Sequence, residues 1–222
     1  MQIDRNQNNQ HFTSKIRFVD KRTFDLLQCF TPKESKIISY DIFDKSGYLL
    51  NRSKVITTDV RTCTGGFVID PEKGIAPLSI HLRNSASNLE EISNLEKFLN
   101  GHNAFFIGAK RRVGCRHIEF AREVFKKISE LTKAKSIKTT ILEGLDDYCG
   151  VDLAYWGKKD TILVGLHRII PQDGKRSQKE YIQIDDMNHL RKFFEKIRIA
   201  QGDEIEFKQR LSLKEIAEFK LS

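Results

Sequence analysis

The chain has 222 residues, of which 39% are hydrophobic and 31% charged, proportions typical of a globular protein with a buried core. Its formal net charge of +8 favours acidic partners but does not distinguish nucleic acid, anionic membrane and acidic protein surfaces. No apolar run reaches the roughly 18 residues that span a bilayer, and residues 1–5 lack the apolar core of a secretory signal. We therefore expect a cytoplasmic protein that does not span a membrane.

The first half of the chain is predicted to be a polar lead followed mainly by strands. Residues 1–11 are almost wholly polar and are predicted to be disordered. From 35 to 70, short β-branched and aromatic runs alternate with turn residues, a pattern typical of strands and hairpins. A helix is predicted over 89–99, where apolar residues recur at helical spacing after a capping box formed by Asn88 and Glu91.

The second half mixes helices with strands. Apolar residues at helical spacing over 113–131 predict the longest helix of the chain. A turn at 157–160 and a polar loop at 172–179 separate further elements. We predict strands at 137–142, 151–156, 161–166, 181–184 and 205–207, a helix at 186–200, and a last helix that Ser212 and Glu215 open as a second capping box.

This order of elements predicts the fold class. Strands interrupted by a few helices, without strict alternation, favour an α+β fold in which helices flank a layered sheet or sandwich. No internal repeat is present, so residues 12–222 are predicted to form a single domain, in which 172–222 is a C-terminal extension.

Cys63 has the most distinctive surroundings of the cysteines. It opens an apolar strand and is followed by Gly65 and Gly66, which allow another backbone or a substrate to approach closely. After a turn at 70–74 the chain returns to His81. An imidazole next to the thiol can take its proton and leave a nucleophilic thiolate. Spacing alone does not establish the pair, because the pairing register could place the two side chains on opposite faces.

The other cysteines and histidines are weaker candidates. Widely spaced cysteines without a Cys-x-x-Cys pair indicate neither a disulfide framework nor a standard zinc site. Cys115 and His117 are two positions apart, and helical positions two apart do not face each other. Packing roles are predicted for Cys29 and Cys149, and surface or core positions for the isolated histidines His102, His167 and His189. The basic groups, such as 110–112, lack an RNA-binding motif, so no specific nucleic acid is expected.

The stretch from Thr57 to His81 resembles the catalytic segment of CheD, the chemoreceptor glutamine deamidase family. In that family a threonine precedes the cysteine by six residues, the cysteine opens a strand that ends in Asp-Pro, and a histidine closes the returning strand. Thr57, Cys63, Asp70-Pro71 and His81 follow this order, the last after one extra residue. The segment 113–120 is similar to the family's Ile-Gly-x-Arg-Asn-Val segment, which opens its main helix, and 150–157 more weakly resembles its glycine-rich closing hairpin.

The resemblance covers about residues 50–168, and the chain departs from the family within it. Arg61-Thr62 stands where the family usually has Gly-Ser, no proline soon follows His81, and the closing hairpin lacks the family's Gly-Arg pair. The first 40 residues and those after about 170 have no counterpart. These departures leave the substrate more open than the chemistry.

The resemblance implies a CheD-like fold for a catalytic domain that converts a glutamine side chain of a substrate protein to glutamate and ammonia. Such a protein-glutamine glutaminase is an amidohydrolase of the Cys-His-Thr type, without metal or organic cofactor. Cys63 would be the nucleophile, His81 its base and Thr57 the residue that orients His81. Thr58 is the rival of Thr57, because a one-residue change of register exchanges them.

Several alternatives remain open on the sequence alone. The catalytic domain of cytotoxic necrotizing factor, a toxin that deamidates Rho GTPases, resembles CheD in fold and in its Cys-His pair. The chain could therefore be a bacterial effector that a dedicated secretion system delivers into a host cell. Transglutaminases and cysteine proteases use the same activated thiol. A non-catalytic CheD-like module that binds an acidic protein partner is the alternative from a different class.

Overall fold

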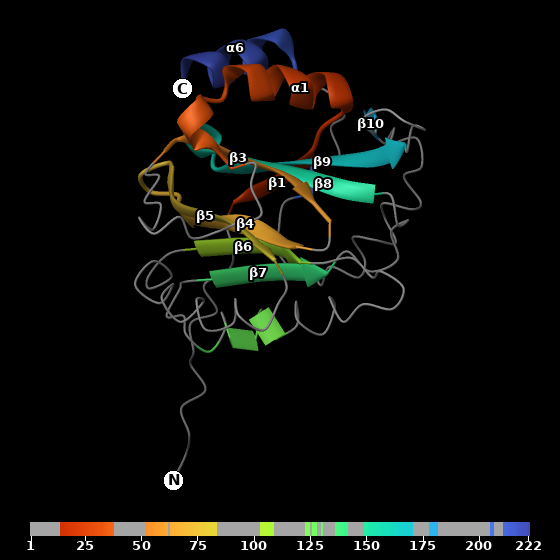
Figure 1. Ribbon diagram of the computed structural model, residues 1–222. Helices are drawn as coiled ribbons and strands as arrows, with labels where there is room; N and C mark the ends of the chain where they lie inside the picture. Colours follow the sequence, from red (N-terminus) through yellow and green to blue (C-terminus); the bar gives the residue numbers. More distant parts are fainter. Residues whose placement is uncertain are drawn as a thin grey trace.

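In the computed structural model, two β-sheets pack face to face, and helices cover the larger sheet (Figure 1). The architecture confirms the predicted α+β class. The structure describes residues 14–37, 52–61, 63–83, 103–108, 123–124, 126–127, 130, 136–141, 149–170, 178–181, 205–206 and 211–222. Within these ranges no helix is long and apolar enough to cross a membrane.

Counted over the described residues, the larger sheet has seven strands and the smaller sheet has four. In the larger one the order is β11 (Ile205–Glu206), β1 (Lys15–Phe18), β9 (Thr161–Ile170), β8 (Cys149–Trp156), β3 (Lys54–Val60) and β2 (Lys36–Ile37), with β10 (Gln178–Tyr181) also paired to β9. In the smaller one it is β5 (Ile75–Arg83), β4 (Cys63–Asp70), β6 (Asn103–Gly108) and β7 (Ser136–Ile141).

Alternation along β8 divides the core into two layers. Tyr155 faces the four-stranded sheet, where its ring lies 6.4 Å from that of Phe67 in β4. The next residue, Trp156, faces the helices and packs edge-on against Phe219, with ring centroids 5.4 Å apart. Because successive strand residues point to opposite sides, the seven-stranded sheet buries both of its faces.

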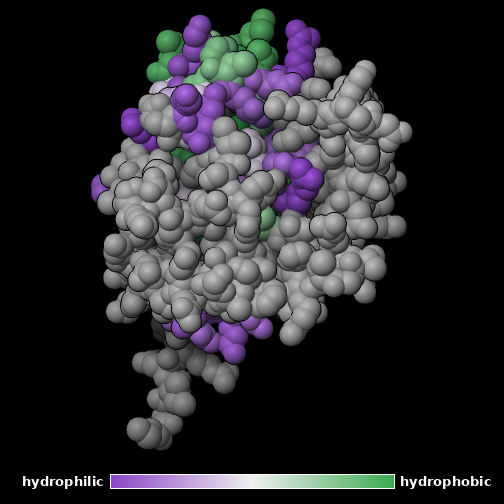
Figure 2. All heavy atoms as spheres, in the orientation of Figure 1, coloured by the Kyte–Doolittle hydropathy of each residue, from purple (hydrophilic) through white to green (hydrophobic). Residues whose placement is uncertain are grey.

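Two helices cover the outer face of the seven-stranded sheet, α1 (Lys21–Phe30) and α6 (Leu213–Leu221) (Figure 1). Their buried side chains join the cluster of strand residues around Trp156. Two leucines of α6, Leu213 and Leu221, are exposed, and Figure 2 shows green hydrophobic atoms among purple hydrophilic ones at the top of the molecule, where Figure 1 places α6.

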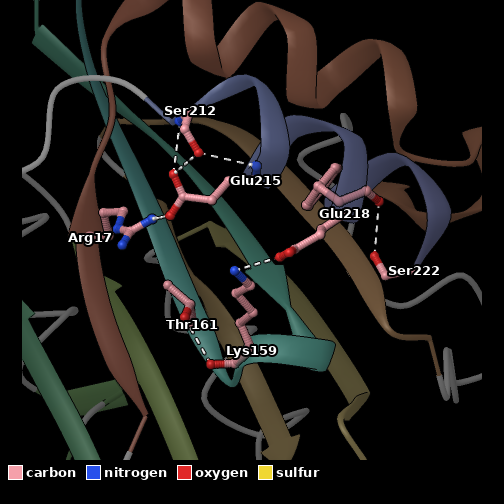
Figure 3. A network of polar contacts seen from close by, with 8 residues as sticks. Arg17, Lys159, Thr161, Ser212, Glu215, Glu218 and Ser222 are labelled. Atoms are coloured by element: carbon pink, nitrogen blue, oxygen red, sulfur yellow. Dashed lines mark hydrogen bonds and ion pairs between the residues drawn. The ribbon is translucent and has the colours of Figure 1, made fainter.

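Polar contacts fix the start of α6 (Figure 3). The Ser212 hydroxyl accepts a hydrogen bond from the Glu215 backbone N–H, and the Glu215 carboxylate accepts one from the Ser212 backbone N–H. Arg17 of β1 donates to the same carboxylate at 2.7 Å. The capping box predicted at Ser212 and Glu215 is therefore confirmed, and it also ties the C-terminal helix to the sheet.

Most predicted strands that fall within the described residues are confirmed. They are the hairpin β4–β5 and the strands β7, β8, β9 and β11. The turn predicted at 157–160 contains the 3-10 helix η3 (Gly157–Lys159). Of the helix predicted over 113–131, residues 123–124, 126–127 and 130 are described and are helical.

Some predictions need correction or lie outside the described residues. Of the strand expected at 181–184, only Tyr181 is described, and it is the last residue of β10. β10 begins at Gln178, within the loop predicted at 172–179, because these residues pair with the end of β9. β1, α1, the 3-10 helix η1 (Lys33–Ser35) and β6 were not predicted from the sequence. The predicted disordered lead 1–11 and the helices predicted at 89–99 and 186–200 lie outside the described residues.

Candidate active site

The β4–β5 pairing places Cys63 and His81 on one face of the four-stranded sheet. His81 pairs directly with Gly65, and Cys63 pairs with Arg83. Because side chains two positions apart on a strand point the same way, Cys63 and His81 are diagonal neighbours. Phe67 shares their face and meets the other sheet, so the pair lies in the interior between the two sheets.

Thr57 reaches His81 from the opposite sheet. It lies on β3, and its Oγ1 is 3.2 Å from Nδ1 of His81 in a buried contact. Thr58, the rival position, is only partly buried, and alternation directs it away from this face. The contact is therefore made by Thr57, and it involves Nδ1 of the imidazole.

Burial keeps His81 neutral. Only 1% of the residue is exposed, and loss of hydration lowers its pKa to about 4, although the carboxylates of Asp59 and Asp152 act in the opposite direction. At neutral pH the ring is thus in the form that can accept a proton.

Cys63 is also buried, with 4% of its surface exposed, and is not disulfide-bonded. Next to it, Val60 of β3 fills the space above Gly65, where a Cβ atom would overlap the valine side chain. The glycine that the sequence singled out as a place of close approach therefore receives a side chain of the neighbouring sheet. This contact brings β3 close to the strand that carries Cys63.

β3 contains a bulge between Thr57 and Val60, where its register with β8 shifts. Within the bulge Asp59 has a φ of 64°, a left-handed conformation that is uncommon outside glycine but tolerated by aspartate. Its backbone N–H donates to Oδ1 of Asp152 at 2.7 Å. Arg61 donates two hydrogen bonds of 2.7 Å to its carboxylate.

His167 lies between the two aspartates. Its Nε2 is 3.1 Å from Oδ1 of Asp59, and its Nδ1 is 3.2 Å from Oδ2 of Asp152. The side chains of His167 and Asp152 are fully buried. His167 was predicted to be an isolated surface or core histidine, and in the structure it is a core histidine beside two aspartates.

The sequence marked one residue of this cluster, Asp152, as unusual, but it did not indicate which residues contact it. Asp152 is a charged residue inside an apolar strand, which is unusual without a partner. Its contact with Asp59 joins positions 93 apart, and that of His167 with Asp59 joins positions 108 apart. Only the folded sheet brings them together.

The structure describes only some of the other candidate cysteines and histidines. Cys29, predicted to be a packing residue, is exposed on α1, because its position falls on the side of the helix turned away from Phe24 and Leu27. Cys149 begins β8, but its side chain is not described. Thr62, Cys115, His102, His117 and His189 lie outside the described residues.

Among the described residues, no group of three histidine, cysteine, aspartate or glutamate side chains is arranged to hold a metal ion. The chain matches no protein-family model, and no curated protein matches it.

Proposed function

We propose that this protein is a protein-glutamine deamidase with Cys63 as nucleophile, His81 as general base and acid, and Thr57 as the residue that orients His81. The observation that carries the proposal is the buried Thr57–His81 contact beside the diagonal position of Cys63. A thiol, an imidazole and a polar group on the second ring nitrogen form the arrangement of a nucleophilic triad.

The resemblance to CheD indicates which reaction these residues would catalyse. That family has the same three residue types in the same chain order, and the chain has the α+β class that the resemblance implies. The net charge of +8 supports a substrate or partner protein with an acidic surface. A chemoreceptor substrate would place the protein in the cytoplasm, and a host GTPase substrate would make it a secreted effector.

The reaction begins when Nε2 of His81 takes the proton of the Cys63 thiol. The thiolate attacks the carboxamide carbon of a substrate glutamine, and backbone N–H groups near Cys63 stabilise the tetrahedral oxyanion. The imidazolium then gives its proton to the departing nitrogen as the C–N bond breaks, which releases ammonia and leaves a thioester.

The second half of the reaction uses the same histidine. Neutral His81 removes a proton from water, the resulting hydroxide attacks the thioester carbonyl, and the C–S bond breaks to give glutamate. The proton returns to the Cys63 sulfur. These steps require no metal or organic cofactor, and Thr57 accepts the Nδ1–H of His81 throughout.

Mass spectrometry of glutamine-containing proteins tests the proposal. Chemoreceptor cytoplasmic domains and Rho-family GTPases are incubated with wild type, Cys63→Ser and the matched control Cys29→Ser, in which an exposed cysteine is changed. We expect amide-to-acid conversion with wild type and Cys29→Ser, and none with Cys63→Ser. Conversion that survives in Cys63→Ser would refute the proposed nucleophile.

The same incubations separate deamidation from the other thiol chemistries. Added primary amine would be incorporated by a transglutaminase, and shortened peptides would indicate a protease. For a non-catalytic binding module, Cys63→Ala would keep the full biological effect. Each of these results contradicts the deamidase proposal.

A further inference from the structure

The mechanism above does not use four charged or titratable residues that meet at the β3 bulge: Asp59, Arg61, Asp152 and His167. We call them the bulge network. We propose that the bulge network is a positioning device, which holds β3 so that Thr57 and Cys63 keep their places around His81. This inference rests on the proposed function, because it concerns the geometry of the same Cys-His pair.

The bulge network and the Cys-His pair lie on opposite sides of β3. Thr57 pairs with Leu153 of β8 and faces the four-stranded sheet. Asp152, one residue earlier, therefore points to the other face. His167 pairs with Gly150, which is two residues from Asp152, so it shares that face. The bulge network therefore contacts one face of β3, and Thr57 contacts His81 on the other face.

The contacts converge on one backbone position. Asp59 combines a φ of 64° with hydrogen bonds from Arg61 and His167 to its carboxylate and one from its own N–H to Asp152. Thr57 lies two residues before it, and Cys63 lies four residues after it. A different conformation at Asp59 would shift the bulge, and with it the residues on both sides.

Basic side chains lie beside both carboxylates of the bulge network. His167 has Nε2 3.1 Å from Oδ1 of Asp59 and Nδ1 3.2 Å from Oδ2 of Asp152, and Arg61 forms an ion pair with Asp59. Buried charges persist when they are paired in this way, and removing one member leaves an uncompensated charge. The arrangement therefore specifies one geometry of the bulge.

Gly150 supplies the space for His167. A Cβ atom at Gly150 would lie 2.6 Å from Nε2 of His167 and 3.2 Å from Cγ of Arg61. The variant Gly150→Ala would displace the imidazole without changing any charge. It is therefore a steric counterpart to variants that remove a charge.

The bulge network also acts on His81 through its charges. Asp59 of β3 and Asp152 of β8 both favour the protonated ring, against the larger effect of burial. Loss of either carboxylate would lower the pKa of His81 further. The removal of a nearby negative charge also favours the thiolate over the thiol, so we expect the pH midpoint of Cys63 reactivity to fall when Asp152 is neutralised.

The test measures alkylation of Cys63 by iodoacetamide in the folded full-length protein. Peptide mass spectrometry gives the rate at Cys63 across pH, with the exposed Cys29 of the same molecules as internal reference. We expect Asp152→Asn and Gly150→Ala to lower the Cys63 rate about tenfold or more, because small displacements of reacting groups have effects of this size. The Cys29 rate should not change.

Asp160→Asn is the matched control. Asp160 is the other aspartate with a positive φ in the described part of the chain, 44°, and it is held by Ser14 and Tyr155 in the turn at the opposite end of β8 and β9. We expect this variant to leave the rate and pH midpoint of Cys63 alkylation as in wild type, whereas Asp152→Asn lowers the midpoint. A midpoint that moves equally in both variants would overturn the proposal.

Two further variants keep the outcomes distinct. Arg61→Lys retains the positive charge but loses the two hydrogen bonds to the Asp59 carboxylate. Because the Arg61 side chain is 39% exposed, this variant tests the positioning role if Asp152→Asn fails to fold. His81→Asn tests the proposed function itself. If His81→Asn lowers the alkylation rate of Cys63 but none of the folded bulge-network variants does, the positioning role is wrong and the proposed function stands. A Cys63 rate that His81→Asn leaves unchanged, or an inert Cys63 in wild type, overturns the proposed function.

Discussion

The behaviour of His81 with pH follows from its burial. Its pKa in the folded protein, about 4, is below the ordinary value of 6.5, so the unfolded chain binds the proton first as pH falls. Folding stability should therefore decrease from about pH 6.5 to pH 4, by about 3 kcal/mol in full. Urea unfolding of wild type and His81→Asn across this range tests the prediction, since the variant should lack this part of the acid sensitivity.

Thr57 provides a second test at the residue scale. Thr57→Val keeps the shape but removes the hydrogen-bond partner of Nδ1, a contact worth about 1 kcal/mol or more when buried. We expect a fall in kcat/KM of about tenfold, with little change in substrate binding. Thr58→Val is the control, and an equal effect of the two substitutions would show that the hydroxyl of Thr57 has no special role.

The sequence indicated that Thr57, Cys63 and His81 come close together, but it did not indicate the bulge network beside them. Cys63, His81 and Thr57 lie within 25 residues of one another, so a hairpin and one neighbouring strand are enough to bring them together. Asp152 and His167 belong to a hairpin that reaches β3 from much later in the chain. Because no local pattern reports such a contact, the bulge network could not be predicted.

At the scale of elements, the start of α6 depends on Glu215. Burial opposes its ionisation, but hydrogen bonds from Ser212 and Arg17 outweigh this effect and lower its pKa to about 2. A lowered pKa stabilises the fold above pH 4.5, the ordinary value, and this contribution is lost as pH falls towards 2.

Glu215→Gln should therefore destabilise the protein at neutral pH, by about 1–2 kcal/mol for the weakened cap and the lost ion pair. Thermal unfolding monitored by circular dichroism measures the difference. The stabilities of variant and wild type should converge as pH falls from about 4.5 to about 2. A constant difference across this range would show that the charge of Glu215 contributes nothing.

The elements that were not predicted from the sequence differ in the reason. β1 has four residues and lies between β9 and β11, both more than 140 positions away. In α1, by contrast, a local signal was present: Asp20 caps the helix, and Phe24 and Leu27 face the core. β6 is a short apolar run, and periodicity alone does not separate such a run from a helix segment.

For the whole molecule, the two sheets should unfold as one unit. Their facing sides share a core in which Phe67 meets Tyr155, and Thr57 and Val60 of one sheet contact His81 and Gly65 of the other. Phe67→Ala should cost about 3–5 kcal/mol and increase amide exchange equally in β4 and β8. Hydrogen exchange followed by mass spectrometry would contradict the single-domain prediction if only β4 lost protection.

The most direct test of the account is deamidation carried out in water enriched in heavy oxygen. Wild type should convert a substrate glutamine to glutamate that contains one oxygen atom from the solvent, because water hydrolyses the Cys63 thioester. Cys63→Ser and His81→Asn should each give no product above the background without enzyme. Labelled glutamate formed equally by wild type and Cys63→Ser, or no conversion of any tested substrate by wild type, would contradict the proposed active site.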